Sequence, residues 1–315
     1  MRAVAVPRFR APAVLTELPI PKAGTNELVV RVEFAGINPF DWKIADGIFE
    51  GSRPHVFPLI LGIDAAGTVE STGEGVTRLR PGDRVVGSFL HDPVGLGTYS
   101  EFAVVPETNA VASLPPGLPS DQGAALPTAG MTALASLEML ALPAGATLLI
   151  TGASGGVGSF ATELAAARGA RVTAVARESS AARLRSFGAE GVIDPTQGDP
   201  YSAVHAQFPA GVDGLLDLMS DRTTFPRWAA CVRPGATAAT TTFSADPESL
   251  KGRVRAVNIN LQPTTALLER LIRSVIDDHL RVPLERTVRL EESADALGEL
   301  RSGRGHGKTV VNPRM

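Results

Sequence analysis

The chain has 315 residues, a formal net charge of −3 at pH 7, 44% hydrophobic residues and 20% charged residues. These values exclude a disordered chain and predict either two domains or one large α/β unit. A near-neutral charge supplies no basic face, so we expect no nucleic-acid partner. Cys231 is the only cysteine, which excludes an internal disulfide and a cysteine-rich metal lobe.

Two further features concern the location of the protein in the cell. The segment from Met1 to Leu18 contains prolines and arginines in place of the continuous apolar stretch of a signal peptide. The apolar runs elsewhere are shorter than a membrane span. Together with the single cysteine, these features predict a cytoplasmic protein without a membrane partner.

The first third of the chain has the pattern of a small, irregular β-barrel or sandwich. Short runs rich in β-branched residues predict strands, and clusters of proline and glycine between them predict turns. The predicted strands cover residues 28–33, 67–70 and 83–86, and the predicted turns cover residues 21–24, 73–75 and 81–83.

From residue 120 onward, helices alternate with buried strands. A first helix is predicted over residues 120–142, and Gly169 and Gly188 are expected to close the next two helices. This alternation predicts a parallel, doubly wound sheet. The later predicted strands are 146–151, 171–176, 191–194, 212–217, 288–290 and 308–311, and the later predicted helices are 159–168, 180–187, 265–278 and 292–301.

The strongest chemical signal is the sequence TGASGGVG over residues 151–158, between a predicted buried strand and a predicted helix. Ala153, Gly155 and Gly158 occupy the three positions of a dinucleotide-binding fingerprint. In this pattern Gly155 lets backbone amides approach a pyrophosphate, and Gly158 lets the helix pack against the strand. The alternative is an ordinary tight turn. The predicted cofactor contacts in this segment are Ala153, Ser154, Gly155, Gly156, Val157 and Gly158.

The end of the second strand predicts which dinucleotide binds. NAD-selective enzymes place an acid about 20 residues beyond the glycines, where it binds the ribose 2′-hydroxyl. Arg177 occupies that place here, followed by Ser180 and Arg183. A guanidinium and a hydroxyl suit a 2′-phosphate, so NADPH is the predicted cofactor. Glu178 supports NADH as the alternative, because its carboxylate is able to bind an unphosphorylated ribose.

Seven segments in order along the chain resemble those of the medium-chain dehydrogenase/reductase superfamily, in its zinc-independent quinone oxidoreductase branch. They are GINPFDWK (36–43), PLILGIDAAGTV (58–69), PGDRV (81–85), GTYSEF (97–102), AALPTAGMTA (124–133), GASGGVG (152–158) and GRGHGK (303–308). The resemblance implies an α/β fold with a GroES-like β-barrel catalytic domain over residues 1–119 and 266–315. It also implies a Rossmann NADPH-binding domain over residues 120–265, an active site between the domains, and a homodimer.

The resemblance also bears on metal binding. Zinc-dependent members carry a cysteine in the first segment and Gly-His-Glu in the second, where this chain has residues 39–41 and residues 62–64. We therefore expect no metal. Four side chains could still gather around an ion, but they are expected to be turn carboxylates and surface imidazoles. These are Asp41, His55, Asp64 and His91.

A reductase without a metal has no strong Lewis acid, so an acceptor that already delocalises charge is favoured, such as a quinone or an activated enone. Asn38 matches the asparagine of the family and is the first candidate to donate a hydrogen bond to the developing oxyanion. A turn-forming asparagine before Pro39 is the alternative. Asp41 and Lys43 are candidate relay groups, although Asp41 could simply cap a helix and Lys43 could simply be solvated.

Further candidates surround the nicotinamide and the acceptor. Thr132 is a predicted contact of the nicotinamide or its phosphates, with a turn cap as the alternative. The resemblance implies that the backbone at Thr241 and Phe243 binds the carboxamide, with strand filler as the alternative for the threonine run. Trp42, Phe49, Phe89 and Phe243 could line a flat apolar substrate pocket, with ordinary core as the alternative. Many relatives have a tyrosine near Phe49, so a phenolic proton donor is lost there, and Tyr99 is expected to serve a strand.

The main prediction is therefore an NADPH-dependent, zinc-independent reductase that transfers a hydride to a quinone or an activated enone. One alternative is an enoyl reductase of a polyketide-type secondary-metabolite pathway. The other is a redox sensor that binds NADPH without turnover.

Overall fold

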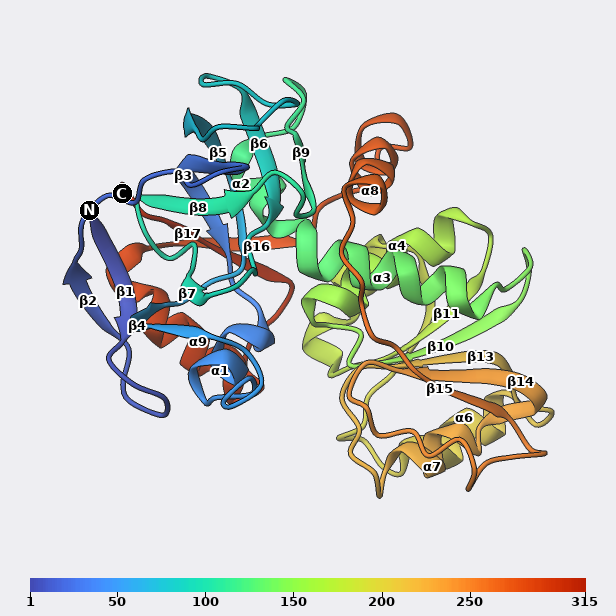
Figure 1. Cartoon of the computed structure of the whole chain (residues 1–315). Helices are drawn as coiled ribbons and strands as arrows, with labels where there is room; N and C mark the ends of the chain where they lie inside the picture. Colours follow the sequence, from blue (N-terminus) through green and yellow to red (C-terminus); the bar gives the residue numbers. More distant parts are fainter. The chain divides into compact units, whose positions relative to one another are not determined.

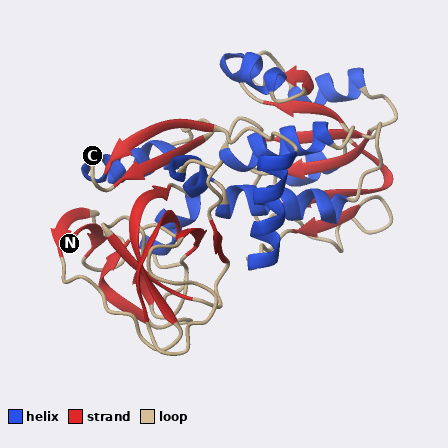
Figure 2. Cartoon of the chain, turned by 90° about the horizontal axis from the view of Figure 1, so that it is seen from above, coloured by secondary structure: helices blue, strands red, loops and turns tan.

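The computed structural model describes residues 1–315 and contains two units, each with its own hydrophobic core. Unit 1 comprises residues 1–131 and 263–315, and unit 2 comprises residues 132–262. The predicted boundary after residue 119 lies before the observed boundary after Met131. The difference arises because helix α2 (Ser120–Ala125) packs on strands of unit 1. Figure 2 shows that strands dominate unit 1, whereas helices and strands alternate in unit 2.

Unit 1 is built from two sheets with the strand orders β2-β1-β4-β7 and β16-β17-β3-β5-β6-β9, and β8 also pairs with β3. Its first-segment strands are β1 (Arg2–Val6), β2 (Val14–Glu17), β3 (Glu27–Gly36), β4 (His55–Ile60), β5 (Asp64–Thr72), β6 (Arg84–Ser88), β7 (Val94–Leu96), β8 (Phe102–Pro106) and β9 (Val111–Ser113). Its other elements are α1 (Pro39–Ala45), α8 (Thr265–Asp277), β16 (Leu284–Arg289), η2 (Leu290–Glu292), α9 (Ser293–Arg301) and β17 (Lys308–Asn312).

The last strand of the chain joins the sheet that contains β3. β17 pairs antiparallel with β3, with Val310 opposite Gly36, and β3 pairs antiparallel with β5, with Gly36 opposite Asp64. This register brings the start of β17, the residues after β3 and the start of β5 together at one end of the sheet. Three segments that are distant in sequence thereby meet at one place.

Unit 2 is a parallel sheet with the strand order β12-β11-β10-β13-β14-β15. Helix α4 lies on one face, and α6 and α7 lie on the other (Figure 1). The order reverses between β10 and β13, which is the point where doubly wound sheets bind ligands. The elements are β10 (Thr147–Thr151), α4 (Gly156–Ala167), β11 (Arg171–Val175), η1 (Glu178–Ser180), α5 (Ala181–Ser186), β12 (Ala189–Ile193), α6 (Pro200–Gln207), β13 (Val212–Asp217), α7 (Phe225–Ala229), β14 (Val232–Thr240) and β15 (Arg255–Asn258).

The predicted helix over residues 120–142 is two helices, so that prediction was wrong in its continuity. α2 ends before Leu126, and α3 (Pro127–Leu140) begins with a proline. Proline has no N–H to donate to the preceding turn but fits the first turn of a new helix. The short helices α6 and α7 were missed. None of the helices combines the length and the apolar character that crossing a bilayer demands.

Candidate functional site

The glycine-rich turn of unit 2 has the geometry of a phosphate cradle. Gly152 has a φ of +65°, a conformation that side chains rarely adopt. A Cβ added at Gly158 would lie 2.5 Å from Ala153 Cα, so only glycine lets the helix approach the turn this closely. Gly155 is the N-cap of α4 and has no side-chain cap.

The end of α4 is therefore open to an anion. A Cβ added at Gly155 would meet only Gly152 O, at 3.5 Å, and the backbone amides of the first helical turn have no intrahelical acceptor. Ser154, Gly156 and Val157 are partly exposed beside it. These donors and the positive end of the helix dipole fit the pyrophosphate of a dinucleotide.

The predicted 2′-phosphate residues lie after β11 in different environments. Arg183 donates from Nη2 to Ser154 O at 2.7 Å, which ties its guanidinium to the glycine-rich turn. Ser180 is buried, whereas Arg177 and Glu178 are exposed. Asp194, which was not predicted, accepts from Glu178 N at 2.8 Å. Hydrogen bonds from Thr196 lower the pKa of Asp194, and Arg177 adds a smaller electrostatic contribution.

The remaining predicted cofactor contacts of unit 2 lie on α3 and after β14. Thr132 is buried on α3, and Ser136 Oγ donates to its carbonyl at 2.6 Å. Thr241 N donates to Asp217 O at 3.1 Å, which fixes the chain as it leaves the sheet. Phe243 has a φ of +59° and is 53% exposed, so its ring is available to a ligand and does not belong to the core.

Unit 1 contains a buried polar network around Asn38. The Asn38 side chain donates from Nδ2 to Asp64 Oδ2 at 2.9 Å and accepts from Lys308 Nζ at 2.6 Å. Lys308 Nζ also donates to Ile37 O at 2.7 Å. Thr128 donates to Asp64 from its backbone N at 2.9 Å and from its Oγ1 at 2.8 Å. Both ends of the Asn38 amide are therefore engaged, and the side chain is oriented by its neighbours.

Asp41 lies next to this network. Its Oδ2 accepts from Asn38 N at 2.7 Å and from Tyr99 Oη at 2.8 Å, whereas its Oδ1 is buried without a partner. Burial, with repulsion from Asp64, raises the pKa of Asp41 from an ordinary 3.8 to about 7. Two carboxyls and one ammonium are thus enclosed together, and charge balance is reached when Asp41 keeps its proton.

The other three titratable groups of the network are shifted in the directions that burial dictates. Burial raises the pKa of Asp64, although Lys308 and the donors of Thr128 and Asn38 oppose this. Burial lowers the pKa of Lys308 below its usual range, against the attraction of both carboxyls. Burial and the adjacent Asp41 hold the pKa of Tyr99 well above its usual range. Every shift favours the neutral form of its group.

Sequence reasoning missed Asp64, Tyr99, Thr128 and Lys308 as members of this site. The interpretation of Asp41 and Asp64 as turn carboxylates was wrong, because both are fully buried, in α1 and at the start of β5. His91 is not a surface imidazole, since it is 7% exposed. All four missed residues lie within segments that carry the family resemblance. That resemblance was the signal in the sequence that could have identified them.

The predicted substrate-pocket residues of unit 1 differ in how deeply they are buried. Phe89 is 2% exposed and belongs to the core, whereas Trp42 and Phe49 are partly buried against that core. Lys43 is exposed on α1. These observations favour the core interpretation for Phe89 and the solvated interpretation for Lys43.

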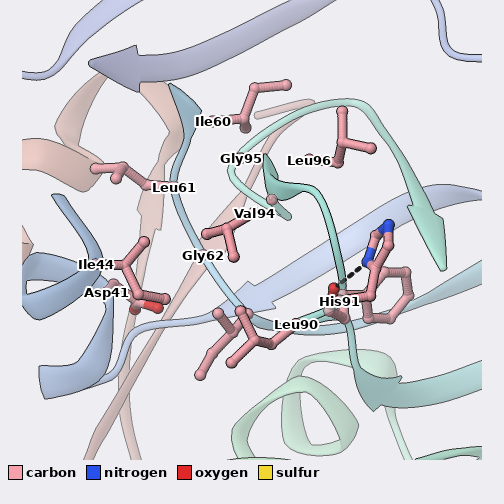
Figure 3. A pocket seen from close by; sticks show the side chains of 13 residues that line it. Asp41, Ile44, Ile60, Leu61, Gly62, Leu90, His91, Val94, Gly95 and Leu96 are labelled. Carbon is pink, nitrogen blue, oxygen red and sulfur yellow. Dashed lines mark hydrogen bonds between the residues drawn. The ribbon is translucent and has the colours of Figure 1, made fainter. Parts of the chain in front are cut away.

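A small cavity of about 20 Å³ adjoins Asp41. Figure 3 shows Asp41 and Ile44 of α1 on one side of it, with His91 and β7 beyond. His91 Nδ1 lies 2.7 Å from Phe89 O, and its Nε2 is buried without a partner. A cavity of this size suits a single water molecule and is far too small for a quinone.

The residues at this place do not fit a zinc ion. Both oxygens of Asp64 are engaged by Asn38 and Thr128, and Ile63 stands where zinc-dependent members have histidine. No group of three or more histidine, cysteine, aspartate or glutamate side chains is arranged to hold a metal. A zinc site needs three or four such ligands.

Comparisons with known proteins agree with this geometry. Residues 24–116 match the family described as "Alcohol dehydrogenase GroES-like domain", and residues 156–273 match "Zinc-binding dehydrogenase". The chain is 30% identical to the chloroplast envelope quinone oxidoreductase homolog of Arabidopsis thaliana, over 94% of this chain and 93% of the relative.

Solved structures give the same result over the whole chain. The quinone oxidoreductase from Coxiella burnetii superposes with a TM-score of 0.89 at 27% identity, over 100% of this chain and 99% of that one. Mycobacterial Rv1454c, solved in complex with NADPH, superposes with a TM-score of 0.86 at 26% identity, over 99% of this chain and 100% of that one. The chain therefore belongs to the medium-chain dehydrogenase/reductase superfamily, in its quinone oxidoreductase branch, and is an NAD(P)H-dependent oxidoreductase.

Proposed function

We propose that the protein is an NADPH-dependent reductase that transfers a hydride to a quinone or an activated enone without a metal. The observation that carries the proposal is the uncapped N-terminus of α4 behind the turn of Gly152, Gly155 and Gly158. When bound there, the dinucleotide supplies a hydride from C4 of its nicotinamide. The acceptor takes up this hydride and one proton, so a quinone leaves as the hydroquinone.

The preference for NADPH over NADH rests on the guanidinium groups that follow β11. Arg177 is exposed, and Arg183 is tied to Ser154 at the phosphate turn, so positive charge lies where a 2′-phosphate would bind. Glu178 and Asp194 oppose this preference, although Asp194 accepts hydrogen bonds from Thr196 and from the backbone of Glu178. The relative solved with NADPH supports the same choice.

In unit 1 the network around Asn38 has a positioning role. Asn38 is 2% exposed, and its amide is held between Lys308 and Asp64, so it fixes the end of β3 and the start of α1. Burial raises the pKa of Asp41, at the start of the same helix, to about 7. Because Ile63 stands where zinc-dependent members have histidine, the proposed acceptor is one that delocalises the incoming charge itself.

Oxidation of NADPH and NADH with three acceptors tests the proposal. The acceptors are 9,10-phenanthrenequinone, 1,4-benzoquinone and a conjugated enone, and kcat/KM is measured for each pair. We expect turnover with a quinone and a higher kcat/KM for NADPH. Turnover of the enone alone would favour an enoyl reductase. Tight NADPH binding without any turnover would contradict a reductase and favour a redox sensor.

Two further proposals concern assembly and location. β15 lies at the edge of the unit 2 sheet, so one side of it is left for pairing with a second copy. We propose a homodimer, which light scattering after size-exclusion chromatography tests. The cytoplasmic location predicted from the sequence is tested by fractionation of the source cells.

A further inference from the structure

A second buried carboxylate lies in unit 2, at the end of β13. Asp217 is 0% exposed, and its Oδ1 accepts from Thr151 Oγ1 and from Ser220 Oγ, both at 2.6 Å. Its Oδ2 accepts from Thr240 Oγ1 at 2.8 Å and from Ser220 N at 3.3 Å. Donors surround both oxygens, which is the arrangement of an ionised carboxylate.

None of the groups that contact the Asp217 carboxylate carries a positive charge. The network of unit 1 is different, because Lys308 is enclosed there with its two carboxyls. The donors around Asp217 are three neutral hydroxyls and one backbone amide, so this carboxylate has no counter-charge beside it. Such a charge acts over several ångströms in a poorly polarisable interior.

The position of Asp217 relates this charge to the cofactor site. Thr151 ends β10, Asp217 ends β13 and Thr240 ends β14, and the strand order of the sheet reverses between β10 and β13. Doubly wound sheets bind their ligand outside the carboxyl ends of the strands at this reversal. Gly152, in the phosphate turn, is adjacent, since a Cβ on it would lie 3.3 Å from Leu218 Cβ.

The same carboxylate ties three loops together. Thr242 Oγ1 donates to Ser220 O at 2.7 Å and lies 2.9 Å from Thr240 Oγ1. The loops after β10, β13 and β14 are therefore linked through Asp217 and its hydroxyl neighbours. The loop after β14 carries Thr241 and Phe243, which are proposed to contact the nicotinamide.

We propose that Asp217 is an electrostatic determinant of the cofactor's redox state, favouring the oxidised, positively charged nicotinamide over the reduced, neutral one. This inference rests on the proposed function. A ring that gives up its hydride gains one positive charge, and a fixed anion near the site stabilises that charge. Asp217 thus promotes hydride donation to the acceptor, and it increases the affinity for NADP⁺ relative to NADPH.

The test replaces Asp217 by asparagine, which has the same shape without the charge. With its amide nitrogen in the place of Oδ1, the new side chain can donate to the hydroxyls of Thr151 and Ser220, and its oxygen can accept from Thr240 Oγ1 and Ser220 N. Dissociation constants for NADP⁺ and for NADPH are measured by calorimetry at one ionic strength. We expect D217N to lower the affinity for NADP⁺ relative to NADPH by roughly three- to tenfold.

Two controls separate the charge from the structural role. D213N removes a carboxylate from the start of the same strand, where Asp213 pairs with Arg233, and should leave the affinity ratio unchanged. D217E retains the charge and should keep the wild-type ratio. If D217N does not fold, as judged by thermal melting, D217S is measured in its place.

The outcomes are distinct. A fall in the affinity for NADP⁺ relative to NADPH, in the neutral variants alone, supports the inference, and a change in the opposite direction overturns it. Equal weakening of both nucleotides by D217N would overturn it and leave Asp217 with only a structural role. If the wild-type protein binds neither nucleotide, the proposed function itself fails and the inference fails with it.

Discussion

Replacement of Asp41 by asparagine should remove a pH dependence from the stability of unit 1. The Asp41 side chain is fully buried, and its Oδ2 accepts from Asn38 N and Tyr99 Oη. The oxygen of an asparagine can accept both hydrogen bonds. Its amide nitrogen then takes the place of Oδ1, which has no partner in the native protein.

The magnitude follows from the pKa of Asp41. Burial raises this pKa from 3.8 to about 7, so between these values the folded state holds a proton that the unfolded state has lost. The free energy of unfolding therefore falls as the pH rises through this window and levels off above about pH 7. At about 1.4 kcal/mol per pH unit, the fall that depends on Asp41 amounts to about 4 kcal/mol.

Urea unfolding between pH 4 and pH 8 measures this effect. The protein has two tryptophans, Trp42 in unit 1 and Trp228 in unit 2, so a W228F background makes fluorescence report on unit 1 alone. We expect a flatter pH profile for D41N than for the parent. D46N, which removes an exposed ion pair with Arg301 at the end of the same helix, should shift the profile without flattening it. Parallel profiles for D41N and the parent would refute the assignment of a proton to Asp41.

Three other variants test separate parts of the site. R177A should weaken NADPH binding at least tenfold more than NADH binding, as measured by calorimetry, whereas R185A on the exposed side of α5 should not change the preference. N38A should lower kcat more than it changes the affinity for NADPH, and unchanged kinetics would remove Asn38 from the site. G158A places a Cβ 2.5 Å from Ala153 Cα, so it should cost about 1–3 kcal/mol in thermal unfolding and prevent nucleotide binding. Wild-type affinity in G158A would show that the cradle is not the binding site.

The geometry of the glycine-rich turn was predictable because its residues are contiguous in sequence. The residues from Thr151 to Gly158 form one strand end, one turn and one helix start, and each glycine has a local reason. Gly169 and Gly188, predicted to close their helices, have φ values of +81° and +95° in the structure. Local geometry of this kind is determined by backbone conformations that only glycine adopts readily.

The network of unit 1 was not predictable by the same means. Lys308 reaches Asn38 across 270 positions of sequence, and only the register of β17 on β3 brings them together. Asp64 was assigned to a turn because nothing in its neighbours reveals that β5 begins there in a fully buried position. The family resemblance marked both segments, but the proton balance among the enclosed groups depends on burial, which the sequence does not show.

The two units enclose their carboxylates in opposite ways. Around Asn38, the ammonium of Lys308 and the proton of Asp41 cancel the charge, and the network costs little beyond its desolvation. Around Asp217, three hydroxyls and one backbone amide donate the hydrogen bonds, and no positive charge offsets that of the carboxylate. An uncompensated buried charge lowers stability, and an asparagine at the same place would satisfy the same neighbours without it. The retained charge is therefore better explained by the ligand than by the fold, because a cation formed at the reversal of the sheet is the partner that the Asp217 carboxylate lacks.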